Sequence, residues 1–211
     1  MSWTTYANQQ IQNALLQAAA LGAPSTWYVG LLAVPNPAGI WTGSTSYATG
    51  AYAVPSTFSS IAGQQGKIFK ATTGGTSGGS EPAWPTGEGA TVTDNTVTWT
   101  EASTLFQAGT FTGAEPSGSN YGRVGVAASS ANFSGATNAE PSVSYNATGI
   151  VFPTPSAGWG YAVGAILCDA VSAGNVWNWA ALLSPFNCAA GVALSLPANG
   201  LALQLSALLT A

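Results

Sequence analysis

The chain has 211 residues and a net charge of −4, and only 5% of its residues are charged, whereas soluble domains average about 25%. Its three cations, Lys67, Lys70 and Arg123, are scattered, so the sequence excludes a nucleic-acid-binding face, which needs several cations together. A surface with so few charges has little repulsion between copies and predicts a protein that works within an assembly. The alternative is a secreted monomer with a neutral surface.

Membrane insertion and secretion are not indicated either. No stretch approaches 18 consecutive apolar residues, so we expect no membrane span. Residues 6–21 are too polar for the core of a signal peptide, and no basic residue precedes them. We therefore expect a protein that is made in the cytoplasm.

The N-terminal segment has the pattern of one helix. Thr4 or Thr5 can cap its start, Gly22 is expected to end it, and Pro24 follows. The apolar positions that recur at helical spacing are Ile11, Ala14, Leu15, Ala18 and Leu21. Because this apolar stripe is narrow, the helix should pack on a sheet or on a partner subunit.

The rest of the chain is predicted to be β-rich. Short segments of aromatic and aliphatic residues alternate with turn residues, which is typical of a sandwich or barrel. The expected strands are 25–32, 122–128, 148–152, 161–168, 176–183, 193–196 and 201–208. The Ala- and Leu-rich tail, 192–209, contains Pro197 and Asn199-Gly200, which favours a hairpin over a helix.

Residues 41–103 differ from the rest of the chain, because they hold six of the ten charged residues. This shift in charge density predicts a small separate domain inserted between residues 1–40 and 104–211. Within it, residues 73–80 are expected to form a loop, and residues 91–99 a strand, a turn at Asp94-Asn95 and a second strand.

Five other residues carry specific expectations. Cys168 and Cys188 lie in apolar stretches; a disulfide would need neighbouring strands, and two buried thiols are favoured for a cytoplasmic product. Arg123 is expected to pair with Glu115 or Asp169 as a structural tie. Trp177 and Trp179 are two residues apart, so they should share one strand face, in the core or at a subunit interface.

Catalytic chemistry finds little support in the sequence. Histidine is absent, which removes the usual triads and nearly all zinc sites, and no phosphate-binding loop is present. Two placed carboxylates could still hydrolyse a glycosidic bond, but nothing brings Glu81 and Glu88, or Glu115 and Glu140, to catalytic distance. We therefore expect a protein that is not an enzyme and that uses no cofactor or metal.

The small domain resembles known modules. Trp41, Ser44, Tyr47 and Gly50 are similar to the opening of chitin-binding-type carbohydrate modules. The continuation is similar to a module repeated in many phage tail and virion proteins, and it comprises residues 67–74, 77–78, 81–85, 89–94 and 97–99. The resemblance covers about 60 residues and departs at Ala51, where such modules often carry Asp.

The flanking parts resemble the small phage proteins that are labelled tail-fibre, head-fibre or capsid-decoration proteins. The segments that carry this resemblance, through their order and spacing, are the N-terminal helix, 27–31, 118–124, 150–153, 158–160, 165–170, 174–177 and the end of the chain. The resemblance implies a virion location, with the protein on the outer surface of a tailed-bacteriophage particle.

The combined expectation is an all-β protein, a β-sandwich or jelly-roll-like main domain with one N-terminal α-helix and a small inserted β module. Its function would be structural, as a decoration or fibre subunit that forms a homo-oligomer such as a trimer and binds phage capsid or tail proteins. The alternative is a receptor-binding module that recognises host surface glycan. Sugars stack on exposed aromatic rings, and the candidate rings are Trp41, Tyr47, Tyr52, Trp84 and Trp99.

Overall fold

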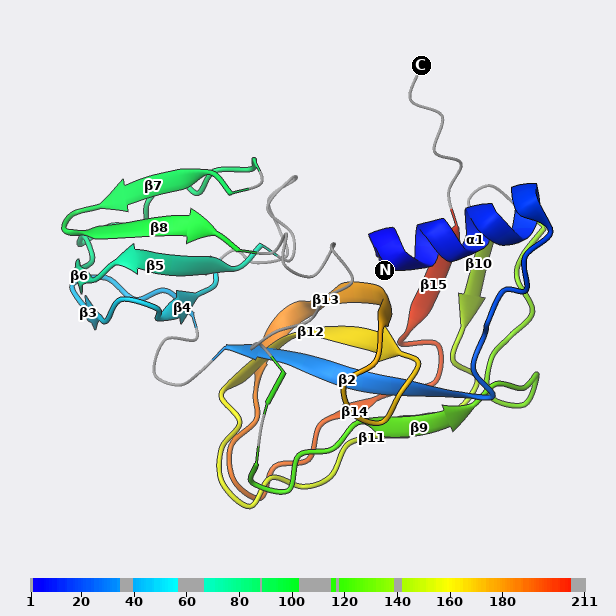
Figure 1. Cartoon of the computed structure of the whole chain (residues 1–211). Helices are drawn as coiled ribbons and strands as arrows, with labels where there is room; N and C mark the ends of the chain where they lie inside the picture. Colours follow the sequence, from blue (N-terminus) through cyan, green and yellow to red (C-terminus); the bar gives the residue numbers. More distant parts are fainter. Residues whose placement is uncertain are drawn as a thin grey trace.

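A computed structural model of the chain describes residues 2–34, 40–56, 67–87, 89–102, 115–116, 118–138 and 142–205. In these ranges the fold is built from strands and one helix, α1, so the all-β expectation with an N-terminal helix is confirmed. Figure 1 shows a four-stranded sheet beside a five-stranded one, with α1 above β10 and β15. None of the described helical residues form a helix long and apolar enough to cross a membrane.

The five-stranded sheet has the order β1-β13-β12-β2-β9, and its neighbouring strands are antiparallel. Its strands are β1 (Ser2–Trp3), β2 (Thr26–Val34), β9 (Val124–Ala127), β12 (Tyr161–Cys168) and β13 (Val176–Asn187). At its centre, β12 is buried along nearly its whole length, as its continuous apolar sequence predicts. β2 and β9 are paired neighbours although residues 35–123 separate them in the chain.

Two short ribbons cover one face of this sheet. β10 (Ser142–Tyr145) pairs with β15 (Ala202–Leu205), and β11 (Ile150–Val151) pairs with β14 (Ser195–Leu196). The core between the layers includes Leu31 and Leu167 from the sheet and Ile150, Phe152 and Leu196 from the ribbon side. This two-layer arrangement buries the alternate side chains of each strand, as in a sandwich.

The four-stranded sheet, of order β4-β5-β8-β7, is formed by residues between β2 and β9. Its strands are β4 (Tyr52–Ala53), β5 (Phe69–Thr73), β7 (Thr91–Asp94) and β8 (Val97–Glu101), with β3 (Ser46–Tyr47) and β6 (Gly75–Thr76) as a separate pair. The strand–turn–strand expected at 91–99 is confirmed, with Asn95 in the left-handed conformation. The expected loop at 73–80 contains β6, so it is partly a strand.

The two sheets share a core cluster. Val54 and Ile68, which flank strands β4 and β5, pack in one cluster with Leu32, Val163 and Ile166 of the five-stranded sheet. This cluster occupies the face of that sheet opposite the ribbons, because alternate residues of a strand point to opposite faces. The residues that flank β4 and β5 therefore join the four-stranded unit to the main sheet.

Helix α1 (Thr5–Gln17) begins where the sequence predicts but ends earlier. Thr4 is the N-cap: its Oγ1 accepts a hydrogen bond from the Ala7 amide at 3.2 Å and donates to the Val176 carbonyl at 2.6 Å. The expected end at Gly22 is wrong, because Ala18 is already left-handed (φ 54°) and closes the helix. Leu21 therefore lies outside the helix, and Leu15 is 78% exposed. Only part of the predicted apolar stripe therefore packs against the rest of the protein.

Each expected strand of the main domain overlaps an observed strand, but β1, Ser2–Trp3, and β10, Ser142–Tyr145, were not predicted. The expected C-terminal hairpin is wrong. β14 and β15 follow each other in sequence yet pair with β11 and β10 instead of with each other. Residues 206–209 of the tail lie outside the described residues.

A bulge in β13 separates the two tryptophans that the sequence places on one face. Leu167 pairs with Asn178 and Cys168 with Val176, which leaves Trp177 as the extra residue. Trp177 packs edge-to-face on Tyr6 and Trp27, whereas Trp179 belongs to the cluster beneath the four-stranded sheet. The expectation that Trp177 and Trp179 share one strand face is therefore wrong, although both side chains are buried.

Candidate functional site

The five candidate glycan-contact rings occupy two kinds of position. Tyr47, Trp84 and Trp99 are at most 5% exposed and form the core of the four-stranded unit with Phe69 and Val97. Trp84 and Trp99 pack edge-to-face with ring centroids 5.8 Å apart. Trp41 and Tyr52 are only partly buried. A ring that is enclosed by other rings presents no face to a sugar, so Trp41 and Tyr52 are the two candidates with accessible surface.

The carboxylate of Asp94 holds the side chains of Trp41 and Trp99 by hydrogen bonds. Its Oδ2 accepts hydrogen bonds from the indole N–H groups of Trp41 at 2.8 Å and Trp99 at 3.1 Å, and its Oδ1 accepts one from the Gly78 amide at 2.7 Å. The Asp94 side chain is buried, and these donors replace the water that a buried carboxylate loses. The sequence indicates only a turn at Asp94-Asn95, because the convergence of Asp94 with Trp41 depends on the fold.

The carboxylates of Glu81 and Glu101 are also held by hydrogen-bond donors or a cation of the same unit. Glu81 accepts from the Trp84 indole at 2.7 Å and the Ser56 amide at 2.8 Å, and it also binds the Ser56 hydroxyl. Glu101 is buried, lies 3.5 Å from the Lys67 ammonium and accepts from the Gly89 amide. The described carboxylates of this unit therefore act as structural acceptors. Glu88 lies outside the described residues.

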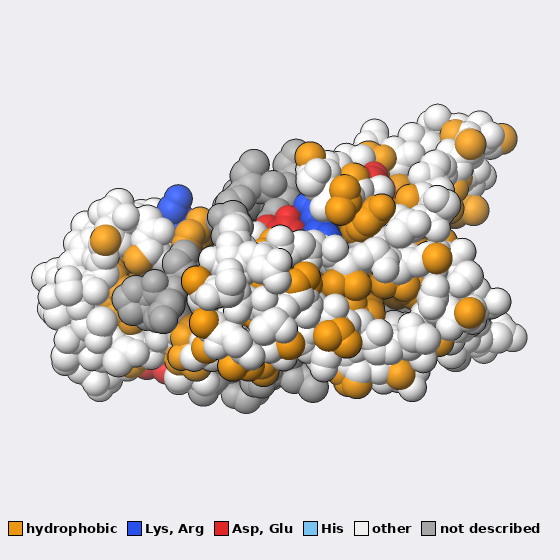
Figure 2. Space-filling model, turned by 90° about the horizontal axis from the view of Figure 1, so that it is seen from below, with side chains coloured by type: hydrophobic (Ala, Val, Ile, Leu, Met, Phe, Trp, Pro, Cys, Tyr) orange, Lys and Arg blue, Asp and Glu red, His pale blue; other side chains and the backbone are white. Residues whose placement is uncertain are grey.

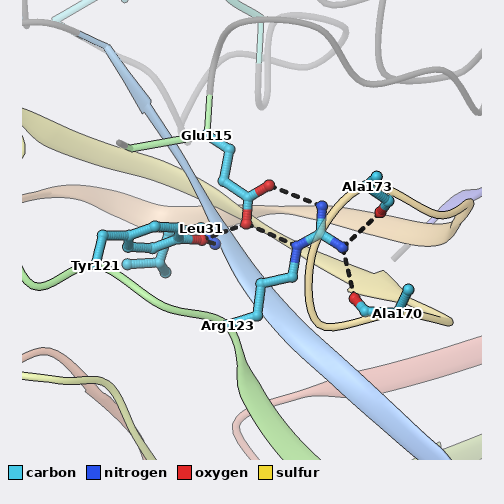
Figure 3. Close-up of polar contacts among 6 residues, drawn as sticks. All are labelled: Leu31, Glu115, Tyr121, Arg123, Ala170 and Ala173. Carbon is cyan, nitrogen blue, oxygen red and sulfur yellow. Dashed lines mark hydrogen bonds and ion pairs between the residues drawn. The ribbon is translucent and has the colours of Figure 1, made fainter. Parts of the chain in front are cut away.

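Arg123 lies at the centre of a buried polar cluster in the main domain (Figure 3). Its Nε and one terminal nitrogen each donate to one oxygen of Glu115 at 2.8 Å, which makes a bidentate ion pair. The other terminal nitrogen donates to the carbonyls of Ala170 at 2.7 Å and Ala173 at 2.8 Å. The expectation that Arg123 pairs with Glu115 or Asp169 is confirmed for Glu115.

Tyr121 joins the cluster to strand β2. Its hydroxyl donates to Glu115 Oε1 at 2.6 Å and accepts from the Leu31 amide at 2.9 Å (Figure 3). Burial, together with the neighbouring Glu115 charge, raises the pKa of Tyr121 far above its ordinary value, so the hydroxyl stays protonated and keeps donating. Gly30 makes room for the cluster, since a Cβ there would lie 2.7 Å from Glu115 Oε1.

The donors of this cluster are used within the protein. The Arg123 side chain is 5% exposed and that of Glu115 is 17% exposed. The hydrogen bond to Glu115 raises the pKa of Arg123 further, so the guanidinium stays charged. The cluster therefore joins three segments, namely residue 115, residues 121–123 and the loop between β12 and β13, and leaves little capacity for a ligand.

The two cysteines are separate, and both are buried and reduced, as favoured from the sequence. Cys168 and Cys188 belong to different core clusters, one on each face of the five-stranded sheet. Burial raises the pKa of Cys168 to about 12 and also raises the pKa of Cys188. Neither thiol is disposed to react, because the thiolate is the nucleophile.

An apolar groove of about 760 Å³ runs beside α1. Ile11 and Leu15 of the helix form one side, and Trp27, Leu167 and Trp177 of the five-stranded sheet contribute to its lining. The other lining residues belong to the helix C-terminal region, the loop after β9 and the β10–β15 ribbon: Ala14, Leu21, Ala23, Ala128, Ser129, Ser130, Phe133, Ser134, Gly135, Ala136, Ser142, Ser144 and Leu203. None of these lining residues is charged. The sequence signal for this feature was the run of Ala and Leu in the helix.

Within the described ranges, no group of three or more His, Cys, Asp or Glu side chains could hold a metal ion. Of the carboxylates considered for glycoside hydrolysis, Glu81 and Glu115 are engaged in the hydrogen bonds above. Glu88 and Glu140 lie outside the described residues.

Comparison with known proteins identifies a family for this chain. The model of the family described as "Podophage GP4 fiber I protein gp80" matches residues 90–204, which is more than half of the chain. The match begins at the last hairpin of the four-stranded sheet and continues through the main domain to β15. No curated protein matches the sequence. The chain therefore belongs to the podophage GP4 fiber I protein gp80 family, and it is a virion-associated structural protein of the phage-fibre type.

Proposed function

We propose that the protein is a structural subunit on the outer surface of the phage particle, as a decoration or fibre subunit, and that it acts as a homo-oligomer, with a trimer favoured. Residues 1–40 and 104–211 form the assembly domain, which contacts other copies and the phage capsid or tail proteins. Residues 41–103 form a module that projects outward. The function is structural, and no catalytic step is proposed.

The observation that carries this proposal is that the described charges of the assembly domain are tied up internally. Glu115 and Arg123 neutralise each other in a mostly buried pair. Asp169 accepts hydrogen bonds from Asn175 and from the Trp177 indole. Figure 2 shows a face on which blue and red side chains are sparse among white and orange ones. A surface of this kind has little repulsion to keep copies apart, which suits a subunit of an assembly.

Thiol labelling of intact particles tests the outward placement of the module. Thr93 is exposed on β7, at the edge of the four-stranded sheet, and the native thiols are buried. In particles that carry Thr93→Cys, this protein should react with a bulky maleimide, and in wild-type particles it should stay unlabelled. A Thr93→Cys thiol that reacts in the purified protein but is protected in particles would contradict the outward placement.

Incorporation tests the structural role itself. Removing the helix, residues 1–17, should abolish incorporation of the protein into particles, because α1 forms part of the apolar surface of the assembly domain. Full incorporation without the helix would contradict an anchoring role for this domain.

A second function is suggested by the partly exposed rings of the module, namely recognition of host surface glycan. Trp41 and Tyr52 keep accessible surface, and the Lys70 ammonium lies 5.8 Å from the centroid of the Tyr52 ring. Under this alternative, Trp41→Ala should reduce attachment to host cells while particles remain intact. Ile40→Ala, a change at the exposed neighbouring residue, is the matched control. Unchanged attachment by the Trp41→Ala particles would remove Trp41 from the proposed contact.

A further inference from the structure

The outer face of α1 carries an exposed apolar ridge. Leu15 and Leu16 are 78% and 81% exposed, the highest values among the large apolar side chains of the described residues. They are adjacent near the C-terminal end of the helix, whereas Ala7, on the inner face, is fully buried. Burying large apolar side chains away from water is favourable in proportion to the area covered, so this ridge favours a contact.

The groove lies directly beside the ridge. Leu15 belongs to both, since it lines the groove and is exposed at its rim. The lining includes the buried side chains of Leu167 and Trp177 of the five-stranded sheet, and Ser129 and Ser130 of the loop after β9. One surface of the molecule thus carries a projecting apolar element next to an apolar depression.

The charges indicate what kind of surface fits there. No lining residue is charged, and neither is any residue of α1, so a partner that brought Asp, Glu, Lys or Arg into the groove would lose their hydration without gaining an ion pair. The chain itself has only ten charged residues in 211, and its own ridge is uncharged. Charge complementarity therefore favours a second copy of this chain over a partner with an ordinary charged surface.

We infer that the Leu15–Leu16 ridge of one copy enters the groove between α1 and the loop after β9 of a neighbouring copy. Because one surface carries both elements, the ridge of each copy can enter the groove of the next in a head-to-tail contact, and such contacts between identical subunits can close into a ring of copies. The inference rests on the proposed function as a homo-oligomer and assigns the surface that forms it.

The first test is the mass of the purified full-length protein in solution. Wild type should have a multiple of the single-chain mass of 21.1 kDa, and Leu16→Lys should fall to the single-chain mass. Lysine is compatible with this site, because it is a good helix former and a cation is favourable near a helix C-terminus. Val171→Lys, at a valine that is 60% exposed in the β12–β13 loop, is the matched control and should keep the wild-type mass.

A second test locates the contact. Leu16→Cys and Ser130→Cys place one new thiol on the ridge and one on the rim of the groove, while the native thiols are buried. An oxidised mixture of the two variants should give a disulfide-linked heterodimer. A mixture of Leu16→Cys with Val171→Cys should not.

The outcomes separate this inference from the proposed function. A monomeric wild type, an unchanged mass for Leu16→Lys, or no cross-link to Ser130→Cys would overturn the ridge-in-groove contact. A confirmed contact in a protein that is never incorporated into particles would instead overturn the virion role and leave the contact established.

Discussion

The hydrogen bonds of Arg123 could not all be made by a lysine at the same position. Its planar guanidinium donates four hydrogen bonds in two directions, two to Glu115 and two to the carbonyls of Ala170 and Ala173. An ammonium is a point charge with three donors, and it cannot bind both sides in this geometry. The Glu115 carboxylate in turn holds the Tyr121 hydroxyl against strand β2.

We predict that Arg123→Met lowers the free energy of unfolding by about 3 kcal/mol, because it leaves Glu115 as a mostly buried charge without its partner. Glu115→Leu should cost a similar amount for the converse reason. The double variant should recover much of the loss, since it removes both charges together. Urea unfolding of the four proteins measures this cycle. Strict additivity of the two single losses would contradict the coupling.

Asp169 makes the β12–β13 loop sensitive to acid. Burial tends to raise its pKa, but the hydrogen bonds from the Asn175 side chain and amide and from the Trp177 indole outweigh this effect and hold the pKa below its ordinary value. Because the folded-state pKa is lowered, the carboxylate stabilises the fold above the pKa of the unfolded chain, about 3.9. That stability is lost as the pH falls through the folded-state value.

We predict that Asp169→Asn lowers the free energy of unfolding at pH 7 by about 1.5 kcal/mol, because an amide cannot accept all of these hydrogen bonds. The difference from wild type should shrink as the pH falls below about 4. Denaturant unfolding of both proteins at several pH values between 7 and 2 measures it. A difference that stays constant across this range would show that the charge of Asp169 does not contribute.

At the scale of the element, α1 is bound firmly at its start and weakly at its end. The Thr4 cap is buried and hydrogen-bonded to β13, whereas the last turn carries exposed Leu15 and Leu16. The helix stops at Ala18, a residue that is unfavourable in the left-handed conformation it adopts there. Packing at the N-terminal end thus fixes where the helix lies, and its C-terminal half presents the ridge.

We predict that Ala18→Gly stabilises the protein by about 0.5–1 kcal/mol, because glycine adopts a positive φ at the helix C-cap without a Cβ penalty. Ala19→Gly, one residue beyond the cap, is the control and should not stabilise. Thermal unfolding of the two variants and wild type checks the difference. A loss of stability in Ala18→Gly would show that the left-handed conformation of residue 18 does not cost stability.

At the scale of the whole molecule, the inserted unit and the main sheet are joined by a shared core. Val54 is fully buried in a cluster with Leu32, Val163 and Ile166 of the main sheet. At the base of the unit, Trp41 donates its amide hydrogen bond to the Val54 carbonyl, and Ala102 donates to the Ile68 carbonyl. The segments that enter and leave the unit are thus paired with the residues that dock it.

We predict that the chain unfolds in one calorimetric transition and that Val54→Ala shifts the whole transition, with a loss of about 2 kcal/mol from the cavity that it leaves. Val92→Ala, at a partly buried residue within the four-stranded sheet, is the comparison and should cost less. Two resolved transitions, with Val54→Ala affecting one of them, would show that the two units unfold independently.

The sequence by itself determined the features that depend on neighbouring residues. An apolar run between turn residues was sufficient to place β12, and alternation around a turn was sufficient for the hairpin of β7 and β8. Because capping is local, the sequence narrowed the cap to Thr4 or Thr5, and Thr4 is the N-cap. The unusually low charge predicted an assembly protein, and the resemblance to phage virion proteins agrees with the family of residues 90–204. Arg123 had few acidic partners in its domain, so an ion pair with Glu115 or Asp169 was predictable from composition, and the structure shows that the partner is Glu115.

Only the tertiary structure decided the features that depend on long-range pairing. The partners of β14 and β15 are strands about 45 to 60 residues away, so local turn signals wrongly favoured a hairpin. The bulge at Trp177 arises from its pairing with β12, and it reverses a face that strict alternation would assign. The burial of Trp84 and Trp99, the exposure of Leu15 and Leu16, and the groove beside α1 all depend on which surfaces the other elements cover, and local sequence does not encode this.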